Sequence, residues 1–101
     1  MQVTTTFHNM LASPGLEAAV ERWTVRLEEI HDQIVGCDVR IEQKHRHRRD
    51  TPFIIHLSLR VPGTHIAFAN EFNLDVYVAL AETFRAARRH LMQHPATSRH
   101  E

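Results

Sequence analysis

Four stretches of the chain alternate between apolar and polar residues, which is the pattern of half-buried β-strands. In the first of them, Val3, Thr5 and Phe7 are separated by polar neighbours. The stretches are residues 2–8, residues 37–44, residues 53–61 and a segment from about Ile66 towards Asn70. Pro62-Gly63 is typical of a tight turn. The short links predict that the last three strands form an antiparallel meander with one partly solvated face.

Two further stretches repeat their apolar residues every three or four positions, which predicts amphipathic helices. The first begins at Ser13-Pro14, a suitable N-cap and first helical position, and is expected to end at Gly36. Its apolar stripe is Leu16, Val20, Trp23, Leu27, Ile30 and Ile34. The second helix is expected to take Asn73 as its N-cap, with Asp75 at its positive end and Pro95 just beyond it. Its buried stripe is predicted to be Val76, Leu80, Phe84, Ala87 and Leu91.

The predicted order of elements is therefore β-α-β-β-β-α. Strands one and two, joined through a helix, should be parallel with a right-handed crossover. Both helices then cover one face of a four-stranded mixed sheet, giving an α+β two-layer sandwich. We expect one domain over residues 1–95, followed by a polar, mobile tail over residues 96–101.

Charge changes this picture, because it is concentrated although the formal net charge is zero. The run Lys44-His45-Arg46-His47-Arg48-Arg49 lies between the second and third strands, and a second cluster, Arg85, Arg88 and Arg89, lies on the last helix. Basic clusters suit a polyanion, because neutralising phosphates releases counterions. The alternative is a solvated loop and an exposed helix in which Arg85 pairs with Glu82.

Other chemistries receive little support from the residues. No apolar stretch reaches the roughly 18 residues of a membrane span, and the N-terminus lacks the pattern of a signal peptide. The single cysteine, Cys37, begins an apolar strand face and is expected to be buried. One cysteine cannot form an internal disulfide, so a cytoplasmic location fits best. No nucleophile, phosphate-loop or zinc-protease motif occurs, so we predict no enzyme, no cofactor and no small-molecule substrate.

The histidines and the large aromatic residues are further candidates for a functional site. His45 with His47, and His90 with His94, have spacings that could bring two imidazoles to one metal ion. A structural zinc site normally needs four ligands, and adjacent arginines repel a cation, so we predict no metal site. Trp23 and Tyr77 are expected to be core residues and not platforms for stacking bases.

At this point the residues match a known family. Four segments resemble ribosome hibernation promoting factors and ribosome-associated inhibitors, also called sigma-54 modulation proteins. They are Asp75-Val76-Tyr77-Val78-Ala79-Leu80, its continuation Phe84 to Leu91, the strand end Val61-Pro62-Gly63 and the opening Phe7-His8-Asn9-Met10. The resemblance runs from about Val3 to Leu91, and the chain looks like the short forms. A subgroup of that family is also rich in His and Arg where this chain has residues 44–49.

The resemblance implies a fold similar to double-stranded RNA-binding domains and binding to rRNA of the small ribosomal subunit, in the channel used by mRNA and tRNA. Translation would be inhibited there in starved or stationary cells, with a second hibernation factor as an open possibility. The resemblance also implies that Arg22 and Arg26 contact RNA. The full predicted set is Arg22, Arg26, Lys44, Arg46, Arg48, Arg49, Arg85, Arg88 and Arg89.

One feature departs from the family. Glu28-Glu29 falls where relatives often have Glu-Lys, and the first helix, counted to Asp32, carries a net charge of −3. The alternative function is therefore a regulator outside the ribosome that binds another RNA or a protein.

Overall fold

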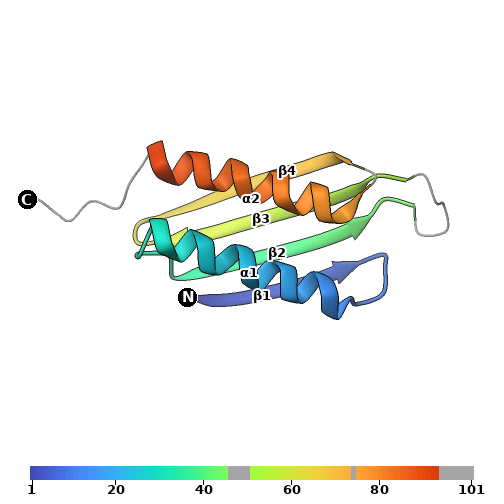
Figure 1. The fold of residues 1–101 in the computed structure, drawn as a ribbon, viewed down its shortest axis with the longest axis horizontal. Coiled ribbons are helices and arrows are strands. Elements are labelled where there is room, and N and C mark those ends of the chain that lie inside the picture. Colours follow the sequence, from blue (N-terminus) through green and yellow to red (C-terminus); the bar gives the residue numbers. More distant parts are fainter. Residues whose placement is uncertain (46–50, 74, 94–101) are drawn as a thin grey trace, which may run out of the picture.

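The computed structural model describes residues 1–45, 51–73 and 75–93, and its elements follow the predicted order (Figure 1). They are β1 (Gln2–His8), α1 (Pro14–Ile30), β2 (Gly36–Gln43), β3 (Phe53–Val61), β4 (Thr64–Asn73) and α2 (Val76–Gln93). The α+β fold class and the β-α-β-β-β-α order are confirmed.

The four strands form one mixed sheet in the order β1-β2-β3-β4. β1 pairs with β2 in parallel, and the β2–β3 and β3–β4 pairs are antiparallel, as the sequence predicts. Only Pro62 and Gly63 join β3 to β4, and Gly63 has a φ of 84°, which glycine adopts without steric cost.

Both helices lie on one face of the sheet and make the second layer (Figure 1). The core between the layers contains the inward residues of β2 and β3, such as Val39, Ile41 and Leu57, and the apolar stripes of the helices. In α2 the predicted stripe is confirmed, with Leu80, Phe84, Ala87 and Leu91 fully buried and Val76 packed at the margin of the core.

The end of α1 differs from the prediction. The helix stops at Ile30, and His31 is its extended C-cap, whereas Gly36 begins β2 and does not terminate a helix. Val35, the residue before β2, is already hydrogen-bonded to the neighbouring strands, since its N–H donates to the carbonyl of Arg60 and its carbonyl accepts from the N–H of Gln2. The chain must therefore leave the helix early to reach the sheet, and Ile34 enters the core from the link between α1 and β2, which contains a turn at Asp32 and Gln33.

The start of α2 is the second correction. Asn73 is the last residue of β4, and the carboxylate of Asp75 caps the helix by accepting from the backbone N–H groups of Tyr77 and Val78 at 2.9 and 3.3 Å. Tyr77 was predicted to be a core residue, and this is wrong because 48% of it is exposed.

The two helices run in the same direction, with their N-termini at the end of the molecule where β2 leads towards β3 (Figure 1). Their C-terminal halves lie at the opposite end. Within the described part of the chain, neither helix has the length and apolar character needed to cross a membrane.

Candidate polyanion-binding site

A groove of about 530 Å³ lies between α1 and α2, near their C-terminal halves. α1 contributes Trp23, Arg26, Glu29 and Ile30 to its lining, and α2 contributes Arg85, Arg88 and Arg89. We call this feature the interhelical groove. Four arginines and one glutamate therefore meet in a hollow whose remaining walls are apolar.

Trp23 organises the floor of the interhelical groove. Its indole is partly buried and stacks on the ring of Phe84, which is fully buried, with ring centroids 5.8 Å apart and planes 13° apart. The guanidinium carbon of Arg26 lies 4.9 Å from the centre of the indole, and that of Arg85 lies 5.7 Å from it. Both distances allow a cation–π attraction. Packing on Phe84 therefore fixes the indole, and the indole in turn positions the guanidinium groups of Arg26 and Arg85.

The lining of the groove holds four arginines against one carboxylate, that of Glu29. The ion pairs found among the described residues join Arg40 to Glu42, Arg60 to Asp38, His56 to Glu42 and the N-terminal amine to Glu28. None of these pairs involves an arginine of the groove.

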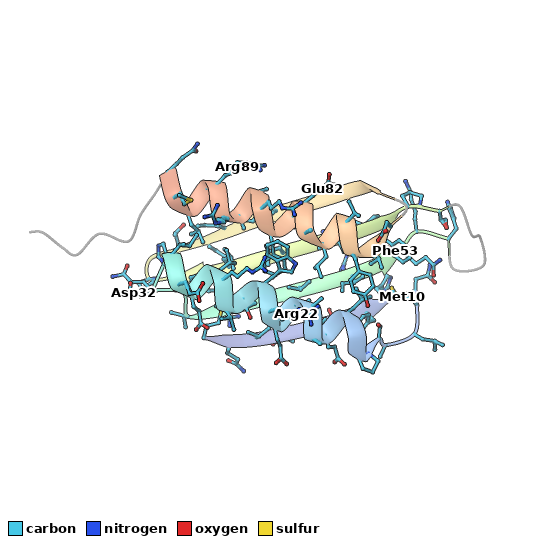
Figure 2. The ribbon with its side chains drawn as sticks, viewed as in Figure 1. Met10, Arg22, Asp32, Phe53, Glu82 and Arg89 are labelled. Atoms are coloured by element: carbon cyan, nitrogen blue, oxygen red, sulfur yellow. The ribbon has the colours of Figure 1, made fainter. Side chains whose placement is uncertain are left out.

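The structure brings together only part of the predicted RNA-binding set. Arg26, Arg85, Arg88 and Arg89 line the groove. Arg22 lies exposed on α1, one turn before Arg26, and Figure 2 shows Arg22 and Arg89 on the helix layer. Lys44 is exposed at the end of β2, which is the other end of the molecule from the groove. Arg46, Arg48 and Arg49 lie outside the described residues.

The acidity of the first helix is less unfavourable than its sequence indicates. Asp32 lies beyond the end of α1, and Glu28 is paired with the N-terminal amine at 3.2 Å. Glu17 lies in the first turn of α1, where a carboxylate interacts favourably with the helix dipole. Of the acidic residues on this helix, Glu29 is the one in the lining of the groove.

The open face of the sheet offers a contrast. There the Arg60 guanidinium is 3.0 Å from the Asp38 carboxylate, and Arg40 is 3.4 Å from Glu42. Positive and negative groups thus alternate on this face and pair with each other. A surface whose charges are already satisfied attracts a polyanion far less than the groove does.

Two other predictions concern cysteine and metal. Cys37 is fully buried, as expected, and burial together with the neighbouring Asp38 carboxylate raises the pKa of its thiol to about 12. The thiol is therefore protonated at neutral pH and is a poor nucleophile. Among the residues that the structure describes, no group of three or more His, Cys, Asp or Glu side chains could hold a metal ion; His47 and His94 are outside them.

Sequence reasoning missed the role of Trp23 in the groove. The indole does pack against the core, as predicted, but it also supports two guanidinium groups. The spacing of Trp23 and Arg26, three residues apart on one helix, was a signal for the first contact. The contact with Arg85 had no signal, because it depends on how α2 packs beside α1.

The mixed sheet, the helix layer and the arginine-lined groove place the chain in the class of small α+β domains with a cationic helix face. The chain belongs to the family described as sigma 54 modulation protein / S30EA ribosomal protein, whose model matches residues 3–97. The resemblance that the motifs indicated is confirmed.

Two solved structures have the same fold. A ribosomal subunit interface protein from Coxiella burnetii is 18% identical, with a TM-score of 0.80 over 93% of this chain and 97% of that chain. The N-terminal domain of Thermus thermophilus Protein Y is 14% identical, with a TM-score of 0.78 over 94% of this chain and 100% of that one. No curated protein matches the chain in sequence.

Proposed function

We propose that this chain binds the small ribosomal subunit through the phosphates of its rRNA, occupies the channel used by mRNA and tRNA, and so inhibits translation. The observation that carries the proposal is the meeting of Arg26, Arg85, Arg88 and Arg89 in one groove. Membership of the S30EA ribosomal protein family supports it, as does the fold shared with a ribosomal subunit interface protein.

The contacts would be electrostatic and largely independent of sequence. Arginine presents a planar fork that binds a phosphate through two parallel hydrogen bonds, and such contacts position a protein on RNA. Arg22 extends the basic surface along α1, and Lys44 with Arg46, Arg48 and Arg49 would add a second contact region.

Co-sedimentation with purified small subunits across a salt series tests this proposal. We expect association that weakens steeply as salt rises, because each neutralised phosphate releases counterions. The double variant Arg88→Gln, Arg89→Gln should bind more weakly and lower the log–log salt slope by roughly 0.7 to 0.9 per lost contact. Absence of association even at low salt would overturn the proposal.

Arg40→Gln is the control for the loss of a single charge and is compared with Arg88→Gln alone, because it removes one arginine charge from the open face of the sheet, where Arg40 pairs with Glu42. Glutamine is a good helix former, so the α2 variants lose charge without a large helix penalty. If Arg40→Gln weakens binding as much as a groove variant does, net charge and not the groove determines affinity.

Occupation of the channel has its own test. Small subunits that already carry mRNA and initiator tRNA should bind the protein much more weakly than empty subunits. A translation assay with added protein should then lose activity in proportion to the bound fraction. Equal binding to empty and filled subunits would place the protein elsewhere on the ribosome.

A regulator outside the ribosome remains the competing function, and the exposed carboxylates of Glu17 and Glu21 on α1 are the observation that favours it. Capture experiments that recover a defined protein partner but no rRNA would support that function.

A further inference from the structure

The interhelical groove concentrates positive charge within a short length of α2. Arg85, Arg88 and Arg89 are three and four residues apart, so they lie within about one helical turn of 5.4 Å. Arg26 joins them from α1. Like charges at these spacings destabilise a helix, and a bound anion would relieve that repulsion.

Two of these arginines are held in place before any ligand arrives. The indole of Trp23 lies beneath the guanidinium groups of Arg26 and Arg85, at 4.9 and 5.7 Å, and is itself stacked on the buried Phe84. Fixing flexible side chains in advance reduces the entropy lost on binding. The groove is thus a preorganised site and not only a basic patch.

The number of positive charges in the groove points to a ligand with several negative charges. A nucleic-acid strand brings one negative charge per phosphate, spaced about 3.4 Å apart along the axis of a helix. An oligophosphate links its phosphates through single bridging oxygens and brings three or four charges within the length of one turn. The number of its charges therefore matches the four arginines of the groove.

The size and lining of the groove agree with such a ligand. Its volume of about 530 Å³ lies within the range of small-ligand sites, roughly 300 to 1,000 Å³. Ile30 adds an apolar part to the wall, which suits the base of a nucleotide.

We propose that the interhelical groove is a binding site for oligophosphate anions, either the triphosphate of a nucleotide or inorganic triphosphate, which compete with RNA for the same arginines. Binding of the anion to the isolated protein needs no ribosome. Only the competition rests on the proposed function.

Direct titration of the full chain with inorganic triphosphate, GTP and guanosine tests the proposal. Trp23 is the single tryptophan of the chain, so its fluorescence reports a ligand that moves Arg26 or Arg85, and calorimetry measures the affinity independently. We expect triphosphate and GTP to bind with Kd values below about 1 mM at low salt. Guanosine should bind much more weakly than either.

The outcomes separate the possible ligands. A GTP affinity well above that of inorganic triphosphate assigns the nucleotide as the ligand, and equal affinities assign the oligophosphate alone; both support the site. Absence of binding by triphosphate and GTP at millimolar concentration overturns the proposal. Binding of guanosine as tight as that of GTP overturns it as well, because the phosphates would then contribute nothing.

Variants locate the site. Arg85→Gln and Arg88→Gln should each weaken triphosphate binding about tenfold, which is the loss of one charge-assisted contact. Glu29→Gln should strengthen it, because it removes the negative charge from the lining. Arg40→Gln, on the sheet face, should change it little. Equal losses in the Arg40 and Arg88 variants would show that the anion is attracted only by net charge.

Trp23 is assigned as a positioning residue. Trp23→Leu should lower triphosphate affinity several-fold in calorimetry, and Trp23→Phe should restore most of it, because phenylalanine keeps an aromatic face beneath the guanidinium groups. A merely structural role would lower the melting temperature without changing the affinity of the folded protein.

Competition is measured by adding triphosphate to the complex with small subunits, at constant free Mg²⁺ and constant ionic strength. We expect release of the protein at the concentrations that fill the groove. Arg22→Gln distinguishes the two proposals, since Arg22 lies outside the lining: it should weaken ribosome binding and leave triphosphate binding unchanged. Ribosome binding without triphosphate binding would reject the anion site alone, and the reverse result would reject the ribosomal function alone.

Discussion

At the scale of single residues, Trp23 and Cys37 show how burial decides chemistry. Trp23 is only partly buried, so one part of its ring packs on Phe84 while the rest supports Arg26 and Arg85. Cys37 is completely buried, and its thiol is removed from reactive chemistry at neutral pH. The sequence predicted burial of Cys37 from strand alternation alone, but it could not predict the contact between Trp23 and a residue of the other helix.

Cys37 leads to a prediction about alkaline pH. Its thiol has a pKa of about 12 in the folded protein against an ordinary value of 9.0. The unfolded chain therefore releases this proton first, and the free energy of unfolding should fall as pH rises from about 9 towards 12. Denaturant titrations over that range should show a steeper loss for the wild type than for Cys37→Ala, which lacks the group. Equal pH dependence of the two proteins would contradict the raised pKa.

At the scale of elements, the sequence predicted the central residues of helices and strands better than their first and last residues. Alternation and helical periodicity are local, so every strand and helix was placed correctly. The predicted C-terminus of α1 and the predicted N-cap of α2 were wrong, because both residues belong to the sheet. Gly36 is the first residue of β2, and Asn73 is paired in β4 opposite Phe53. The start of α1 was right because Ser13 caps it within four residues, by accepting from the N–H of Leu16 at 3.2 Å.

The Ser13 cap makes a prediction about stability. Ser13→Ala should lower the free energy of unfolding by about 1 kcal/mol, because the N–H of Leu16 loses its acceptor. For a domain of this size, the melting temperature should fall by roughly 4 to 8 °C. Ser13→Asn keeps a capping oxygen and should stay close to the wild type in thermal unfolding. Equal losses in both variants would mean that the hydroxyl packs against a neighbour and does not cap the helix.

At the scale of the whole molecule, the interhelical groove and the end of β2, where the 44–49 run begins, lie apart. The interhelical groove lies near the C-terminal halves of the helices, whereas β2 leads into the 44–49 run at the end where the helices begin (Figure 1). Lys44, the described basic residue at the start of the run, is therefore not part of the groove. If both regions contact rRNA, they meet different phosphates, and their contributions to binding should be independent.

This separation is testable by combining variants. Neutralising Arg46, Arg48 and Arg49 should weaken ribosome binding about evenly across RNA sequences and reduce the salt slope. Combined with Arg88→Gln, the losses in binding free energy should add to within about 0.5 kcal/mol, as they do for distant sites. Co-sedimentation of the single and combined variants measures this. If neutralising the run leaves binding unchanged, it is a solvated connection between β2 and β3.

The sequence by itself determined the order of elements, the α+β class, the buried stripes and the family, because periodicity, caps and short motifs are properties of neighbouring residues. Only the tertiary structure decided which charges act together. Arg26 and Arg85 are far apart in the chain, and they meet over Trp23 because α1 and α2 pack side by side on the sheet. The same packing places Arg26 of the acidic helix α1 beside the three arginines of α2, so the groove is basic although α1 also contributes Glu29 to its lining.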